Sequence, residues 1–247
     1  MKKFCICIST FVRHEQDLKN LMECLFSVIQ NVKDSFDIFI LNDSHDKKEI
    51  IIKEVKENNI NNVTVVNTRS KGTAYIYIFQ QVQSLANDYE YYINLHDTTH
   101  FLSPLPELTE DYYHIWSLGK GWKLDEIYQS LCKSIGEKIN FKFDYEKIKE
   151  SAETNFGLYW FMFGCMFIMK RKYIDLIYNT NFKNIYSIEL SRWDRIGLEV
   201  YLGYLCHTLF LTPITSNSIE PRPWPDAVKK EENIFIFEYF KKISFGR

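Results

Sequence analysis

Four short apolar runs alternate with amphipathic segments over the first hundred residues, and this alternation constrains the fold more than any other feature. The runs occupy residues 4–8, 36–41, 62–66 and 89–95. Between them, apolar side chains recur at helical spacing, as Leu18, Leu21 and Leu25 do. Continuous apolar strands separated by amphipathic helices predict an α/β fold with a mostly parallel sheet sandwiched by helices.

The second half of the chain is less regular. The apolar run at residues 159–169, which Gly164 interrupts, predicts a buried strand. The other expected elements are a strand within residues 111–118 and helices within residues 123–150, 171–178 and 192–207. Because the sequence contains no repeat and no clear linker, we expect a single domain over residues 1–247.

Charge and composition exclude several classes of protein. A formal net charge of −2 gives the chain no overall field for gathering nucleic acid. The run at residues 4–8 is too short for a signal peptide or a transmembrane helix. The six cysteines include no C-x-x-C pair and are typical of reduced thiols. We therefore expect a cytoplasmic protein whose tail, residues 233–247, packs against the domain, with peripheral membrane contact as the alternative.

Polar residues follow each of the four expected strands. Thr10 and Arg13 follow the first strand, Asp43 the second, and Lys71 and Gly72 the third. Open α/β sheets bind ligands at these carboxyl ends. Asp43 could accept hydrogen bonds from a base or a ribose, or it could cap the next helix. Gly72 permits close backbone approach, and a helix N-terminus favours phosphate.

The segment after the fourth strand carries one carboxylate, two hydroxyls and two imidazoles, at residues 96–100. A divalent cation that carries a diphosphate needs few protein ligands, because phosphates and waters supply the others. Asp97 and Thr99 are the predicted metal ligands, and His96 or His100 adds a nitrogen ligand if the metal is Mn²⁺. The alternative is a turn in which Asp97 binds backbone amides.

In this order, the motifs resemble the nucleotide-binding half of GT-A glycosyltransferases, especially the family-2-like group. Residues 9–13 are similar to that group's Pro-Thr-Tyr-Asn-Arg segment, and residues 42–46 to its Asp-Asp-Gly-Ser-x-Asp segment. Residues 71–74 are similar to Asn-x-Gly-x-Ala, and residues 96–99 occupy the position of the Asp-x-Asp metal motif. The resemblance covers residues 4–101, with two departures: the second acid of the metal motif is Thr99, and the Gly-Ser pair after the second strand is Ser44-His45.

The resemblance continues more faintly in the second half. Residues 163–167 are similar to an apolar strand whose glycine lines the sugar pocket, which assigns Gly164 to that position. Residues 189–195 lie where inverting members place an acidic base at the start of a helix. Asp194 is the first choice for this base and Glu189 the second, because the base must reach the acceptor hydroxyl. The alternative for Asp194 is an acid that the helix dipole stabilises.

The resemblance implies a glycosyltransferase that transfers a sugar from a UDP- or GDP-type donor, with inversion and assisted by Mn²⁺ or Mg²⁺. The acceptor is a hydroxyl of a glycan, a lipid-linked molecule or a protein. Residues 1–101 would bind the nucleotide and residues 102–247 the acceptor. The implied donor-binding residues are Thr10, Arg13, Asp43, Lys71, Gly72, His96 and Gly164.

Two other functions stay open on the sequence alone. A sugar nucleotidyltransferase would need a Gly-rich loop with a lysine directly after the first strand, and residues 9–13 contain no glycine. A catalytically degenerate GT-A-like binding protein is compatible with a metal motif that has a single acid.

Overall fold

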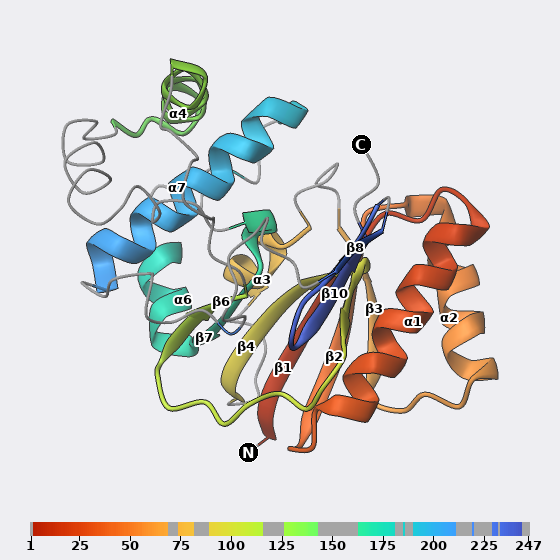
Figure 1. Cartoon of the computed structure of the whole chain (residues 1–247). Helices are drawn as coiled ribbons and strands as arrows, with labels where there is room; N and C mark the ends of the chain where they lie inside the picture. Colours follow the sequence, from red (N-terminus) through yellow and green to blue (C-terminus); the bar gives the residue numbers. More distant parts are fainter. Residues whose placement is uncertain are drawn as a thin grey trace.

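The computed structural model describes residues 2–68, 74–81, 89–115, 126–142, 163–180, 185, 190–210, 219, 229–231 and 233–243. These residues form a six-stranded sheet, a smaller four-stranded sheet and helices on both sides of the larger one (Figure 1). The larger sheet contains β1 (Lys2–Thr10), β2 (Phe36–Asn42), β3 (Val63–Asn67), β4 (Tyr89–His96), β6 (Tyr112–His114) and β7 (Phe167–Lys170). The smaller sheet contains β5 (Thr99–Phe101), β8 (Lys229–Glu231), β9 (Ile234–Ile236) and β10 (Phe240–Ile243).

The larger sheet has the strand order β3-β2-β1-β4-β7-β6. Strands β3, β2, β1 and β4 run parallel, whereas β7 is antiparallel to β4 and β6 is antiparallel to β7. The prediction of a mostly parallel sheet is therefore confirmed. In the register, Ser9 lies opposite both Leu41 and His96, so the carboxyl ends of β2, β1 and β4 meet at one edge.

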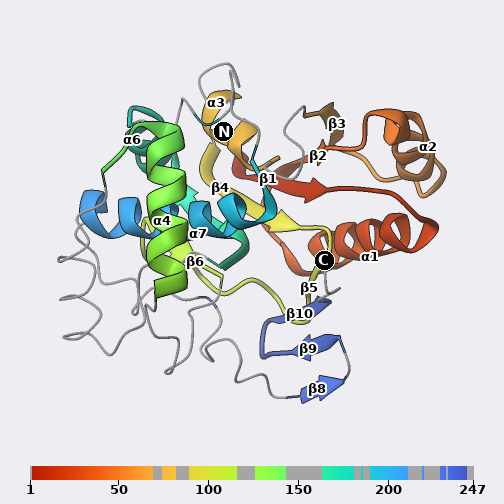
Figure 2. The ribbon, with the colours of Figure 1, turned by 90° about the horizontal axis from the view of Figure 1, so that it is seen from above.

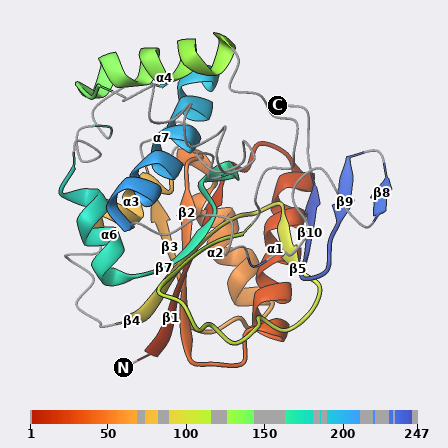
Figure 3. The same ribbon diagram turned by 60° about the vertical axis from the view of Figure 1, so that its left-hand side comes forward.

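Helices cover both faces of this sheet, because successive side chains of a strand point to opposite faces. On β1, Ile6 and Ile8 share a core with α1 (Glu15–Asn31) and α2 (Lys48–Glu57). Cys5 and Cys7 belong to a second core on the other face. The helices of that second face are α3 (Ile76–Gln81), α4 (Glu126–Ile139), α6 (Arg171–Tyr178) and α7 (Arg192–Phe210), which Figure 3 shows together on one side.

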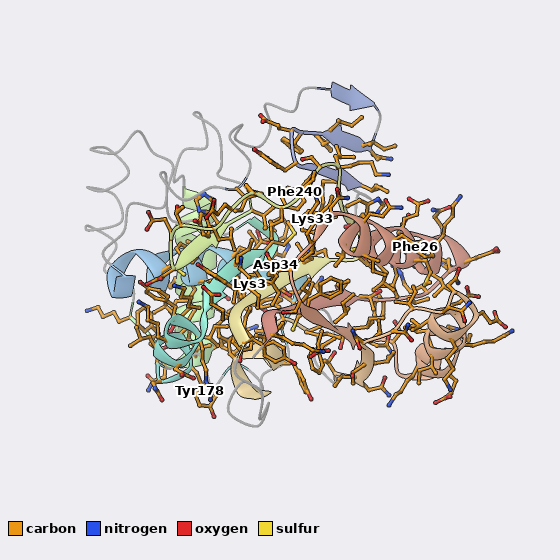
Figure 4. All side chains as sticks on the ribbon, turned by 90° about the horizontal axis from the view of Figure 1, so that it is seen from below. Lys3, Phe26, Lys33, Asp34, Tyr178 and Phe240 are labelled. Atoms are coloured by element: carbon orange, nitrogen blue, oxygen red, sulfur yellow. The ribbon has the colours of Figure 1, made fainter. Side chains whose placement is uncertain are left out.

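The smaller sheet joins the chain's tail to the segment that follows β4. Strand β10 pairs with β5 and β9, and β8 lies at the outer edge, beyond α1 in Figure 2. Phe240 is fully buried where this sheet meets the main body, with its ring 4.6 Å from that of Phe101 (Figure 4). Residues 233–243 thus pack against the domain as predicted. None of the helices in the described residues is long and apolar enough to cross a membrane.

The strand predicted over residues 159–169 is wrong in its extent. A 3₁₀ turn, η2 (Phe163–Cys165), precedes β7, which begins only at Phe167. Gly164 and Cys165 both have positive φ angles, of 62° and 53°, and extended backbone cannot pass through that conformation. Residues 159–162 lie outside the described residues, and the division of the chain at residue 101 stays a prediction.

Buried His114 on β6 makes the fold sensitive to acid. Its side chain is fully buried, and neither ring nitrogen has a hydrogen-bond partner within the described part of the chain. Burial lowers the pKa of His114 from 6.5 to about 3. Between these two values the unfolded chain binds a proton that the folded chain does not, so the free energy of unfolding falls as the pH falls below 6.5.

We expect His114→Phe to reduce the slope of the unfolding free energy against pH by up to about 1.4 kcal/mol per pH unit, the contribution of one proton. Urea unfolding of both proteins at pH 7, 5 and 4 measures the difference. Other titrating groups are common to the two proteins, so the comparison isolates His114. Parallel curves for the two proteins would rule out this account of the histidine.

Candidate functional site

Thr10, at the end of β1, forms hydrogen bonds with both acids of the predicted site, Asp43 and Asp97. Its backbone carbonyl accepts a hydrogen bond from the Asp43 amide at 3.0 Å, and its hydroxyl donates to Oδ2 of Asp97 at 2.7 Å. The Asp97 amide in turn donates to the carbonyl of Ser9 at 3.1 Å. All three predicted residues are buried. The ends of three neighbouring strands thus hold both carboxylates at one edge of the sheet.

Hydrogen bonds to β3 and within the turn fix the segment that carries Asp43. Its Oδ1 accepts a hydrogen bond from the hydroxyl of Thr68 at 3.1 Å. The side-chain amide of Asn42 donates to the Ser44 carbonyl at 2.8 Å and to Oδ1 of Asn67 at 2.9 Å. The cap positions of η1 (His45–Lys47) and α2 are Ser44 and Lys47, so Asp43 is not the N-cap of either.

Lys242 reaches the segment after β4 from the opposite end of the chain, since β10 pairs with β5. Its Nζ donates to Oγ1 of Thr98 at 2.6 Å and to Oγ1 of Thr99 at 3.2 Å. It also lies 3.5 Å from Nδ1 of His96. An ammonium therefore contacts Thr99 and His96, two of the residues predicted to bind the metal or the donor.

The ammonium of Lys242 lies against the segment predicted to bind the divalent cation. Within the described residues, no group of three or more His, Cys, Asp or Glu side chains could hold a metal ion. Oxygen ligands bind Mg²⁺ or Ca²⁺-sized cations at about 2.0–2.6 Å, so a cation on Thr99 would lie within about 6 Å of the Lys242 ammonium. Two positive centres at that separation repel each other. The requirement for Mn²⁺ or Mg²⁺ stays a prediction.

Gly164 connects His96 to a carboxylate on α7. At a φ of 62°, its missing Cβ would lie 3.1 Å from Cε1 of His96, so glycine allows the ring to approach the backbone. Its backbone amide donates a hydrogen bond to the carboxylate of Glu199. Glu199 is partly exposed, and the charges of Lys242 and Arg195 act on it.

Burial dominates the titration of Glu199. It raises the pKa of the carboxyl from 4.5 to about 8, against the opposing effects of the Gly164 amide and of the charges on Lys242 and Arg195. A strongly perturbed carboxyl next to a glycine turn and two cations is typical of a functional site. The sequence analysis did not identify Glu199.

Asp194, the first choice for the base, is buried in a capping arrangement at the start of α7. Its carboxylate accepts hydrogen bonds from the Ser191 amide at 2.7 Å and the Ser134 hydroxyl at 3.1 Å, and it pairs with Lys138. The Asp194 amide donates to the Ser191 hydroxyl at 3.2 Å. Although burial alone would raise its pKa, the hydrogen bonds from Lys138 and both serines lower it to about 2. These contacts match the helix-stabilising alternative, and they tie Asp194 to α4.

The remaining predicted residues divide into two groups. Arg13 is exposed, with its Nε 3.8 Å from Asp17 and its guanidinium over the Phe11 ring. Glu189, Lys71 and Gly72 lie outside the described residues. The residues that the structure brings to the sheet edge are Thr10, Asp43, His96, Asp97, Thr99 and Gly164.

No protein-family model matches the sequence, and no curated protein matches it. Among solved structures, the crystal structure of S. aureus TarS residues 1–349 is similar over 81% of this chain, with 14% identity and a TM-score of 0.42. This chain covers 56% of that structure. Likeness at this level says nothing of activity. The mostly parallel six-stranded sheet flanked by helices is consistent with a GT-A-like fold.

Proposed function

We propose that this chain is a glycosyltransferase that transfers a sugar from a UDP- or GDP-type donor to an acceptor hydroxyl, with inversion. The observation that carries the proposal is the Thr10-linked pair of Asp43 and Asp97 at the carboxyl edge of β1, β2 and β4. Ligands of open α/β sheets bind at this edge. The register of four glycosyltransferase-like motifs over residues 4–101 supports the same function. A glycan, a lipid-linked molecule or a protein could carry the acceptor hydroxyl.

In this proposal, Asp43 accepts hydrogen bonds from the base or the ribose, and Glu199 is the general base. The acceptor oxygen attacks the anomeric carbon as the bond from that carbon to the diphosphate breaks. The electron pair of the broken bond leaves with the nucleoside diphosphate, and the hydroxyl proton passes to the Glu199 carboxylate. A base works best when its pKa lies near the operating pH, which favours Glu199, at about 8, over Asp194, at about 2.

A catalytically degenerate binding protein is the second candidate, because Asp194 is engaged in a helix cap. Such a protein would bind nucleoside diphosphates without turnover. The carboxylate of Glu199, whose pKa burial raises to about 8 beside the Gly164 amide, favours an enzyme instead. A nucleotidyltransferase is disfavoured because residues 9–13, at the end of β1, contain no glycine.

We expect Asp43→Ala to weaken the binding of UDP or GDP by about tenfold or more, because it removes a charged hydrogen-bond acceptor. Calorimetry with UDP, GDP, uridine and guanosine measures the loss, which extends to the nucleosides because Asp43 contacts the base or the ribose. Asp46→Ala is the matched control, since that carboxylate is exposed in the same turn and pairs with Lys47 at 3.2 Å. Hydrolysis of a panel of nucleotide sugars then tests for turnover.

The wild-type protein decides between the candidates. Binding of a nucleoside diphosphate together with sugar release from its donor supports the transferase, and binding alone supports the degenerate protein. Failure of UDP and GDP to bind, with or without Mn²⁺, rejects both.

A further inference from the structure

Buried and partly exposed side chains alternate along β10, and Lys242 occupies a buried position where an apolar residue is expected. Phe240 and Lys242 share the buried side of this strand, whereas Lys241 and Ile243 are partly exposed. Lys242 is only 6% exposed. Burying an ammonium is costly unless other groups compensate for its lost hydration. Proteins break a local rule of this kind mainly at functional sites.

The groups around Lys242 are the ones that a diphosphate-bound metal would be expected to use. The two threonine hydroxyls after β4 accept hydrogen bonds from Nζ, and the His96 ring is 3.5 Å away. Thr98 and Thr99 directly follow Asp97, and the charges of both Asp97 and Lys242 act on the buried thiol of Cys24. The charge of Lys242 also acts on Glu199. The charge of Lys242 therefore reaches the proposed base, and it reaches the same thiol as the charge of Asp97.

We propose that the Lys242 ammonium takes the role of the divalent cation and binds the diphosphate of the donor. This inference rests on the proposed function and names the group that stabilises the leaving nucleoside diphosphate. An ammonium is a compact point charge, which suits an anionic diphosphate. Thr98 and Thr99, which directly follow Asp97 in the chain, position it, since both hydroxyls accept hydrogen bonds from Nζ. Stabilising the charge that develops on a leaving group accelerates its departure.

The test measures by calorimetry how tightly Lys242→Met and Lys241→Met bind UDP, GDP, uridine and guanosine. Each titration is done first in EDTA and then in Mn²⁺. Lys241 is the matched control, because it is the adjacent lysine on the opposite side of β10 and lies 3.7 Å from Glu23. In EDTA, we expect Lys242→Met to weaken nucleoside diphosphate binding by about tenfold to a hundredfold, as for a lost charged hydrogen bond. Nucleoside binding stays unchanged, and Lys241→Met matches the wild type.

A Lys242→Met protein that binds UDP and GDP as tightly as the wild type overturns the inference. So does a wild-type protein that binds them only when Mn²⁺ is present, a result that does not need the variant to fold. In either case the proposed function survives, because nucleoside diphosphates still bind. If no nucleotide binds to the wild type under any condition, the inference and the proposed function both fail. Lys242→Arg keeps the charge and is expected to retain part of the affinity.

Discussion

Replacing Glu199 with glutamine is expected to lower kcat by about a hundredfold to ten-thousandfold, the usual contribution of general base catalysis. Glutamine keeps the shape of the side chain and can still accept the hydrogen bond from the Gly164 amide, but it cannot take a proton. Binding of the nucleoside diphosphate should stay near the wild-type value. Steady-state kinetics with the donor identified in the nucleotide-sugar panel, together with calorimetry, separates the two effects.

The pH profile gives this prediction a second readout. Because burial raises the pKa of Glu199 in the ligand-free protein to about 8, the fraction of ionised base, and with it kcat/KM, should rise as the pH rises through 8. The residual activity of Glu199→Gln should lack this rise. Asp194→Asn is the comparison, and its main expected effect is lower stability, since it removes the partner of Lys138. Loss of turnover in a stable Asp194→Asn, with full turnover in Glu199→Gln, would make Asp194 the base.

Truncation of Phe167 is expected to lower the free energy of unfolding by about 3–5 kcal/mol. Phe167 is fully buried on β7, with its ring 5.5 Å from that of Phe79 on α3. Phe167→Ala removes the ring and leaves a cavity that the surrounding helices can only partly fill. Since domains are typically stable by about 5–15 kcal/mol, this loss would be a large fraction of the total. Urea unfolding at pH 7 measures it.

Phe26→Ala is the matched control for that truncation. Phe26 lies on α1 and is 39% exposed. Surface substitutions usually change stability by no more than about 0.5 kcal/mol, so the two phenylalanines should differ several-fold. Equal losses for both variants would contradict the packing of β7 against α3.

The first half of the fold could be predicted from the sequence because its signals are local. Each buried parallel strand is a continuous apolar run, and the expected runs match β1, β2, β3 and β4 to within two residues. The turn at Gly164 could not be predicted in the same way. Its neighbours Phe163 and Cys165 are apolar and fit a strand pattern, and only the backbone conformation reveals the turn.

The site was less predictable because its contacts join distant parts of the chain. Lys242 meets His96 across 146 positions, and Lys138 meets Asp194 across 56. No periodic pattern reports such pairings. Lys242 does carry a local signal. It lies two residues after Phe240 on β10, and since successive side chains of a strand point to opposite sides, both side chains lie on the buried side. Glu199 gave a similar signal, as an acid among the apolar residues Leu198, Val200 and Tyr201.

The dual role of Thr10 has a consequence for how a ligand would be received. Thr10 binds the backbone of Asp43 and the carboxylate of Asp97, and Thr68 binds the carboxylate of Asp43, so both carboxylates are placed when the sheet forms. These side chains therefore lose their conformational entropy during folding, and the free energy of ligand binding does not include this loss. This half of the site is preorganised. Thr10→Val would remove only the hydroxyl that binds the Asp97 carboxylate. We expect slower or weaker binding of the ligand, with the sheet intact.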